Sequence, residues 1–397
     1  MIDLRAARND PGGFRAALAR KGAAEAFDAL LAADERWREL VPRVDELRGK
    51  LKVKGKPTPE QLEELNRVKE ELRAAEDELA TAEAERDRLL QQVPNPPDPS
   101  SPDGDTEEDA EELRRVGDPA PEGPEHTEIG RFEMERAARL SGSRFGYLVG
   151  DTALLALALY RFAIDRAVAH GHTQVLPPVL VREEAMIGTG FFPTERSNIY
   201  ALADDDLYLT GTSEAALAGL HMDEILDELP LRYSGFSTCF RRESGAAGKD
   251  TRGMFRVHQF NKVELFVFSL PEASRDEHDR LLAIEEEIVG ALGLAYRVVN
   301  VAAGDLGAST AKKYDIEAWF PHQQRYREVT STSNTTDFQA RRLGIRYRPE
   351  GQKGTEIVHT LNGTAVTDRF ALAILETFRG DVPDALRPFG APERIEQ

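Results

Sequence analysis

Residues 240 to 264, FRRESGAAGKDTRGMFRVHQFNKVE, bring together side chains that suit a nucleotide. Arginine offers a planar fork to phosphate oxygens, glutamate can accept from an amino group, and phenylalanine can stack on a base. Period-two alternation at 241–243 and 258–262 predicts two antiparallel strands, joined by a loop at 245–253 that is rich in glycine and charge. The alternative is a surface hairpin with solvated ion pairs. The candidate side chains are Arg241, Glu243, Arg256, Phe260 and Glu264.

This stretch resembles motif 2 of the class II aminoacyl-tRNA synthetases, and specifically that of the seryl-tRNA synthetase family. The resemblance continues in order through nearly the whole chain. Further matching segments are LPPVLV (176–181), EAMIGTGFFP (184–193), Thr212–Ser213–Glu214, YREVTSTSNTTDFQARR (326–342) and HTLNGTA (359–365). The resemblance implies a serine–tRNA ligase, an enzyme of protein biosynthesis that works through a seryl-adenylate.

The resemblance assigns ATP and Mg²⁺ to one set of residues. Arg241 and Arg369 are expected to hold the α- and γ-phosphates as the catalytic pair, because cations must neutralise charge that develops on the phosphoryl oxygens. Glu243 is expected to bind the adenine amino group, and the phenylalanine to stack on the ring. Glu328 and Ser331 match the family's magnesium ligands, which are oxygen donors that a hard cation prefers. The full ATP set is Arg241, Glu243, Phe260, Glu328, Ser331 and Arg369.

A second set is expected to bind L-serine. Arg256 is placed to take the carboxylate, and the other members match residues that surround the ammonium and hydroxyl or close the pocket. A site that hydrogen-bonds the hydroxyl rejects alanine by about 10⁴–10⁵, whereas threonine must be excluded by shape. The full set is Thr212, Glu214, Arg256, Glu264, Asn362 and Thr364.

One segment departs from the family pattern. AVTDR (365–369) is one residue shorter than the usual spacing before the motif 3 arginine, and it places Asp368 directly before Arg369. Losing one residue from a strand turns the following side chains to the opposite face. We therefore expect that Arg369 could be displaced, or that Asp368 could turn toward the phosphates.

The site must be carried by elements further along the chain. We expect a helix at about 152–169, a strand over TQVLPPVLV (173–181), and then alternating strands and helices. The fold class predicted is α+β, with an antiparallel sheet flanked by helices forming a class II catalytic domain at 113–397. In the resembled family the first helix and strand form the interface of a homodimer, so a homodimer is implied.

The N-terminal part, 1–112, is predicted to be a tRNA-binding domain with a long helical hairpin at about 30–93. Apolar residues recur with spacing 3, 4, 3, 4 from Trp37 to Leu51, as in a coiled coil. The polar, proline-rich stretch after it, 94–112, is predicted to be a linker that does not pack.

A basic patch marks the turn of this hairpin, where four lysines occur with no acid among them. A scaffold or dimerisation coiled coil is the alternative, but the patch favours contact with a polyanion. In the resembled family this arm grips serine tRNA, and selenocysteine tRNA is a second candidate partner. The tRNA-binding candidates are Lys50, Lys52, Lys54 and Lys56.

Bulk composition limits the other possibilities. The formal charge of −19 argues against general nucleic-acid binding, although it does not exclude a specific RNA. The single cysteine excludes a disulfide and a multi-cysteine zinc site, so no zinc is expected. No apolar run reaches a membrane-spanning length and no signal peptide begins the chain, so we expect a cytoplasmic protein without membrane contact.

Three functional hypotheses are compatible with the sequence. The first is a housekeeping serine–tRNA ligase. The second is a specialised second copy, altered at motif 3, that serves antibiotic resistance or a biosynthetic pathway. The third is a tRNA-binding paralogue with weak catalysis.

Overall fold

A computed structural model describes residues 1–52, 58–244 and 253–396. It divides into two compact units, Met1–Pro96 and Pro97–Gln397. In the part that the structure describes, no helix is long and apolar enough to cross a membrane.

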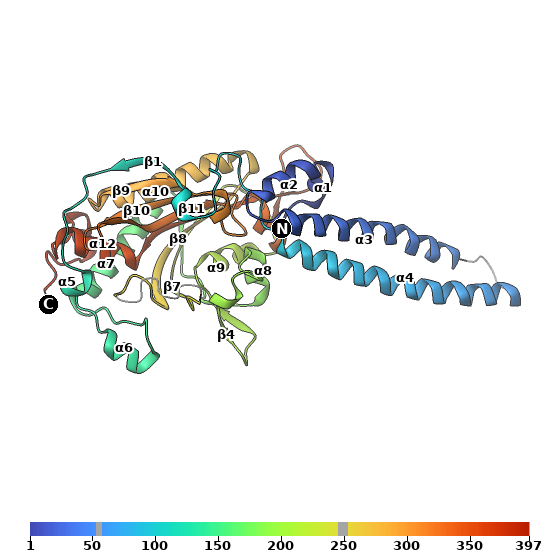
Figure 1. Cartoon of the computed structure of the whole chain (residues 1–397), viewed down its shortest axis with the longest axis horizontal. Coiled ribbons are helices and arrows are strands. Elements are labelled where there is room, and N and C mark those ends of the chain that lie inside the picture. The colour runs from blue at the N-terminus through green and yellow to red at the C-terminus, as the bar shows by residue number, and fades with distance from the viewer. Residues whose placement is uncertain (53–57, 245–252, 397) are drawn as a thin grey trace. The chain divides into compact units, whose positions relative to one another are not determined.

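Among its described residues, the first unit contains helices and no strand. Two long helices run side by side and carry the predicted hairpin (Figure 1). The seam between them buries Val44 and Leu47 against Val68 and Ala75, as the heptad spacing predicts. Arg86 is polar within this seam, and its guanidinium lies 4.1 Å from the centre of the Trp37 ring. The helices are α1 (Leu4–Asn9), α2 (Pro11–Ala19), α3 (Ala24–Lys50) and α4 (Pro59–Gln92).

The hairpin turn is only partly described. α3 ends at Lys50, and α4 begins after Thr58, whose side chain and Gln61 form a capping box. Lys50 and Lys52 are exposed, and the Lys50 Nζ lies 2.8 Å from the Glu46 carboxylate. Of the four candidate lysines, Lys54 and Lys56 lie outside the described residues.

The second unit is built on an eight-stranded sheet in the order β1-β9-β10-β11-β14-β8-β7-β2. Every neighbouring pair is antiparallel except β2 with β7. The predicted α+β class is confirmed. Its strands are β1 (Glu111–Val116), β2 (Thr173–Val175), β7 (Leu231–Phe240), β8 (Gln259–Ser269), β9 (Tyr296–Asn300), β10 (Lys312–Phe320), β11 (Arg325–Asn334) and β14 (His359–Thr367).

Three helices cover one face of this sheet. Strand β8 shows how the faces divide: Val263, Leu265 and Val267 join the apolar core beneath the helices, whereas Lys262 and Glu264 project to the other face. This follows from the period of two in a strand. The second face is therefore free to carry polar chemistry. The covering helices are α7 (Asp151–Ala169), α10 (Ser274–Ala291) and α12 (Asp368–Phe378) (Figure 1).

Smaller elements surround the open face. Two three-stranded sheets, β3-β5-β4 and β13-β12-β6, flank it. Their strands are β3 (Leu180–Val181), β4 (Tyr200–Leu202), β5 (Leu207–Leu209), β6 (Ile225–Leu226), β12 (Arg346–Tyr347) and β13 (Glu356–Ile357). The short helices are α5 (His126–Ile129), α6 (Met134–Ser141), α8 (Glu183–Thr189), α9 (Glu214–Ala218) and α11 (Phe338–Leu343).

Two expectations about local structure are wrong. The strand predicted at 173–181 is two short strands in different sheets, β2 and β3, because Pro177 and Pro178 lack the N–H that a continuous ladder needs. The stretch at 94–112 does pack. The Asp98 N–H donates to the Ala311 carbonyl over 2.8 Å, and the Pro102 carbonyl accepts from Ala303 over 2.9 Å. Backbone hydrogen bonds therefore fix a segment that has few apolar side chains.

Candidate active site

Two adjoining cavities lie in the second unit. The larger has a volume of about 470 Å³ and the smaller about 120 Å³. Six residues line both: Arg241, Glu243, Arg256, Lys262, Ser331 and Thr364. Thr212, Glu214, Glu264 and Asn362 line only the larger, and Phe260, Glu328 and Arg369 only the smaller. The structure therefore brings together all the residues predicted for ATP and serine.

Strands β7 and β8 position Arg241 at the junction of the cavities. The predicted antiparallel pair is present, but β7 ends at Phe240, one residue before Arg241. The Arg241 N–H still donates to the His258 carbonyl over 2.9 Å, which continues the ladder. The Arg241 Nε donates to the Gly211 carbonyl over 3.1 Å, and its guanidinium lies 5.2 Å from the Phe260 ring centre. These contacts hold a cation where the two cavities meet.

Glu243 and Arg256 lie at the two ends of the loop that joins β7 to β8. Residues 245–252 of that loop lie outside the described ranges. Glu243 has φ of +52°, a left-handed conformation that costs energy for a residue with a side chain and is concentrated at functional sites. Its Oε2 accepts from the Arg256 Nη1 over 2.5 Å.

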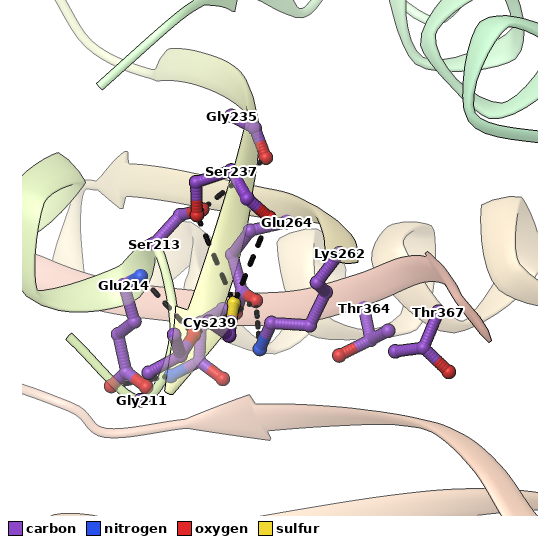
Figure 2. Close-up of polar contacts among 12 residues, drawn as sticks. Gly211, Ser213, Glu214, Gly235, Ser237, Cys239, Lys262, Glu264, Thr364 and Thr367 are labelled. Carbon is purple, nitrogen blue, oxygen red and sulfur yellow. Dashed lines mark hydrogen bonds and ion pairs between the residues drawn. The ribbon is translucent and has the colours of Figure 1, made fainter. Parts of the chain in front are cut away.

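The larger cavity has a row of linked polar groups along its wall (Figure 2). The Thr212 Oγ1 donates to the Glu264 Oε2 over 3.1 Å, and Lys262 forms an ion pair with the same carboxylate. The Glu214 N–H donates back to the Thr212 Oγ1 over 3.2 Å. The wall therefore presents one cation and two carboxyl groups, which is the complement of an amino acid with a charged amine and a carboxylate.

Glu214 receives two amide donors on one oxygen. The Gln339 Nε2 and the Asn362 Nδ2 donate to its Oε1 over 2.7 and 3.0 Å. Burial raises the pKa of Glu214 to about 7, with the nearby Glu264 carboxylate adding to the rise and the Gln339 hydrogen bond opposing it. Glu214 therefore changes charge near neutral pH.

Glu328 and Ser331 both belong to β11, three positions apart, and would ordinarily face opposite sides of the sheet. The register shifts between them, so that Ser331 pairs with Asp315 and Glu328 with Glu317. The extra residue, a β-bulge at Val329, restores them to one face. Desolvation alone would raise the pKa of Glu328, but the surrounding cations, Lys313 and Arg369 foremost, lower it to about 2. A carboxylate and a hydroxyl on one face fit a hard divalent cation.

Arg369 stands in the first turn of α12, where Thr367 caps the helix by accepting from the Arg369 N–H. Its guanidinium lies 4.6 Å from the Phe255 ring centre, and its Nη1 donates to the Glu328 carbonyl over 2.9 Å. The expected displacement of this arginine is wrong, because it lines the smaller cavity with Arg241.

Asp368 also lines the smaller cavity, so the expectation that it turns toward the phosphates stays a prediction. Its carboxylate accepts from the Tyr160 hydroxyl and, over 3.1 Å, from the Asn261 N–H. Strand β14 has its own bulge at Ala365, since Thr364 pairs with Glu264 and Val366 with Val263. That irregularity sets the faces of the side chains after it.

Sequence reasoning missed three residues of the site. Lys262 stands two residues before Glu264 on the same strand face, and that spacing could have found it. Lys313 lies 3.8 Å from the Glu328 carboxylate, but no local pattern marks it. Gln339 lies within the matching segment 326–342, yet its contact with Glu214 joins residues 125 positions apart.

Comparison with known proteins agrees with this geometry. Residues 1–97 match the family model described as the seryl-tRNA synthetase N-terminal domain, and residues 199–378 match the tRNA synthetase class II core domain (G, H, P, S and T). The serine–tRNA ligase of Nocardia farcinica is 48% identical over 412 residues, covering 98% of each chain. That of Streptomyces coelicolor is 49% identical over 424 residues, covering 100% of this chain and 99% of its own.

A solved structure shows the same fold. The crystal structure of seryl-tRNA synthetase from Pyrococcus horikoshii complexed with ATP superposes with a TM-score of 0.93 at 38% identity, covering 100% of this chain and 99% of that one. The order of the motifs, the shared cavities and the full-length similarity lead to one conclusion: the chain belongs to the seryl-tRNA synthetase family of class II aminoacyl-tRNA synthetases.

Proposed function

We propose that this chain attaches serine to serine tRNA in two ATP-dependent steps, and that each residue of the two cavities has a distinct role in them. The ligase activity itself follows from full-length similarity to serine–tRNA ligases. The observation that supports the residue roles best is that the cavity with two carboxyl groups adjoins the cavity with Arg369, and Arg241 lies in both.

In the first step the serine carboxylate attacks the α-phosphorus of ATP, giving seryl-adenylate and releasing pyrophosphate. The serine carboxylate and the α-phosphate are both anions, so cations at the junction of the cavities must hold them together and neutralise their charge. Arg241 takes the α-phosphate and Arg369 the γ-phosphate. Glu243 accepts from the adenine amino group, and Phe260 stacks on the ring.

Mg²⁺ would be held by Glu328 and Ser331, where it would neutralise phosphate charge when bound with ATP. The bulge at Val329 supports this pair, since it places both oxygens on one face. In the described residues no group of three or more His, Cys, Asp or Glu side chains is placed to hold a metal ion. The expectation that the enzyme needs no zinc stays a prediction.

Serine is recognised in the larger cavity. Arg256 binds the carboxylate, and Glu214 and Glu264 accept from the ammonium and the hydroxyl, with Thr212 beside them. Asn362 and Thr364 close the pocket from β14. The protein's own donors to these carboxylates lie on one oxygen of each, the Glu214 Oε1 and the Glu264 Oε2. Serine would donate to the other oxygens, and a ligand without the hydroxyl would lose one of these hydrogen bonds, which is costly in a buried site.

In the second step a ribose hydroxyl of the terminal adenosine of tRNA attacks the seryl carbonyl, and AMP leaves. The exposed Lys50 and Lys52, with Lys54 and Lys56 of the sequence between α3 and α4, contact the tRNA backbone. Selenocysteine tRNA is a second candidate acceptor. We further propose that the enzyme acts as a homodimer, as the family resemblance implies, and that it works in the cytoplasm.

The test is serine-dependent exchange of pyrophosphate into ATP, run beside alanine, threonine and cysteine, and then aminoacylation of serine tRNA. We expect strong exchange with serine alone. A folded protein that binds serine tRNA but exchanges with no amino acid would support the tRNA-binding paralogue instead. A specialised second copy would pass both assays, and only a second synthetase gene in the same genome would favour it.

A further inference from the structure

Gln339 of α11 is completely buried beside the larger cavity. Its Nε2 donates to the Glu214 Oε1 over 2.7 Å and to the Thr189 carbonyl over 3.1 Å. Thr189 also lines the larger cavity. A single amide thus ties the Glu214 side chain to the Thr189 carbonyl at the end of α8.

The orientation of this amide is fixed by the groups at its NH₂ end. The Thr189 carbonyl can only accept, and so can the ionised Glu214 carboxylate, so a reversed amide would set its own carbonyl oxygen against both of them. At the other end the Gln339 Oε1 accepts from the Thr360 Oγ1 over 2.8 Å, and Thr335 donates to the Thr360 carbonyl over 2.8 Å. Gln339 therefore offers its hydrogens to Glu214, and the buried threonines hold its oxygen in place.

Glu214 needs such a donor, because several groups oppose its charge. Burial and the Glu264 carboxylate of β8 both raise its pKa, which reaches about 7. Gln339, together with Lys262 of β8 and Arg241 after β7, lowers it. The other amide on the same oxygen comes from Asn362 of β14. Of the two amides, Gln339 is the nearer and stands on a helix rather than on the sheet.

We propose that Gln339 is a positioning residue of the serine site, whose amide holds the Glu214 carboxylate as the acceptor for a donor group of the substrate. The inference rests on the proposed function, since it names a determinant of serine binding in that same site. Because both amides occupy Oε1, the second oxygen is available to serine. Loss of the Gln339 donor both loosens this carboxylate and favours its protonated form.

The experiment compares wild type with Gln339→Met, which keeps the length of the side chain but cannot donate. Serine-dependent pyrophosphate exchange is measured from pH 6 to 8.5. We expect the KM for serine to rise about tenfold or more at pH 7, since a hydrogen bond to a charged group is lost. The KM for ATP should change less than about threefold. In the wild type the KM for serine should change with pH as Glu214 titrates. In Gln339→Met this change should occur at a higher pH, an effect that a purely structural role would not produce.

Three further variants complete the test. Thr360→Val removes the hydroxyl that donates to the Gln339 oxygen and should raise the KM for serine in the same direction, whereas Thr360→Ser should restore it. Arg341→Gln is the matched control, because Arg341 lies on the same helix but pairs with Asp337 over 2.6 Å. It should leave both KM values and the pH profile unchanged.

Two results would overturn the inference: a folded Gln339→Met enzyme with the wild-type KM for serine and pH profile, or one in which the KM values for serine and ATP rise equally. Serine binding is also measured directly by calorimetry. If the wild type binds serine without any exchange, the proposed function fails, and the ratio of the two serine Kd values still decides the role of Gln339.

Discussion

Arg256 and Glu243 bind each other, with the Arg256 Nη1 2.5 Å from the Glu243 Oε2. The two residues are proposed to bind different substrates, the serine carboxylate and the adenine amino group. In this structure the two side chains are therefore paired with each other. Glu243 reaches this contact from a left-handed backbone conformation, with φ of +52°. Binding of either substrate must therefore compete with this ion pair, which couples the two halves of the site.

Glu243→Gln should separate these roles. Without the negative charge, Arg256 is released for the serine carboxylate, so the KM for serine should fall or stay unchanged, while the KM for ATP rises about three- to tenfold. Pyrophosphate exchange with each substrate varied in turn measures both constants. Arg242→Gln is the control, because Arg242 packs over the Tyr200 ring and lines neither cavity. Equal increases in the two KM values would contradict the idea of competition.

Glu285 should make stability depend on pH. This residue of α10 is completely buried, and burial raises its pKa well above the ordinary value. The folded state therefore keeps a proton that the unfolded state releases, so the free energy of unfolding falls as pH rises above about 4.5. The slope reaches about 1.4 kcal/mol per pH unit. Glu285→Gln, which cannot titrate, should lose this slope.

Denaturant unfolding at pH 5, 6.5 and 8 measures that difference. The variant and the wild type should be closest at pH 5, and the variant should gain relative stability at pH 8. Glu287→Gln is the control on the same helix, since its carboxylate is 42% exposed. A constant difference between wild type and Glu285→Gln at all three pH values would show that Glu285 does not hold its proton.

His126 and Glu376 form a buried hydrogen-bonded pair, with 2.8 Å between the His126 Nδ1 and the Glu376 Oε1. The His126 Nε2 accepts from the Met254 N–H over 3.1 Å, which sets the proton on Nδ1. Met254 precedes Phe255, on which the Arg369 guanidinium lies. His126→Leu removes this hydrogen bond to the Glu376 carboxylate and should cost about 1.5–3 kcal/mol of stability.

Thermal unfolding measures the loss, and the KM for ATP shows whether the Phe255 support also moves. His322→Ala is the control, because its backbone N–H, which donates to the Glu376 Oε2 over 3.1 Å, is retained. It should unfold near the wild-type temperature. An unchanged melting temperature for His126→Leu would mean that the pair does not anchor this region.

Much of this fold can be predicted from local patterns. The heptad spacing of Val44 and Leu47 predicts the paired helices, and the apolar run at 152–169 predicts α7. The candidate site residues came from the family resemblance, segment by segment, and the structure places them around two adjoining cavities, while their individual roles stay predictions. Composition was misleading at 94–112, where backbone hydrogen bonds replace apolar contacts.

Pairing between distant segments could not be predicted from the sequence. The bulge at Val329 decides whether Glu328 and Ser331 share a face, and it depends on how β11 aligns with β10. The position of Arg369 likewise depends on the bulge at Ala365 and on where α12 begins. Counting residues in motif 3 therefore could not place Arg369, because the register of β14 against β8 and the start of α12 decide which way each side chain faces.

The lysines at the hairpin turn should contact serine tRNA. Lys52 is exposed, and Lys50 is exposed with its ammonium 2.8 Å from Glu46. Lys52→Glu should weaken the binding of serine tRNA. It should also lower the slope of the logarithm of the binding constant against the logarithm of salt concentration by about one, because each phosphate contact releases about one condensed cation. The effect should be smaller for Lys50→Gln, since Glu46 already offsets that charge.

Filter binding from 50 to 250 mM salt gives the slope, and Lys69→Glu on α4 is the control away from the turn. The loss should appear in aminoacylation and not in pyrophosphate exchange, which needs no tRNA. Equal affinity and slope for Lys52→Glu and Lys69→Glu would mean that the turn does not touch tRNA, and the basic patch would then be no more than a solvated end of the coiled coil.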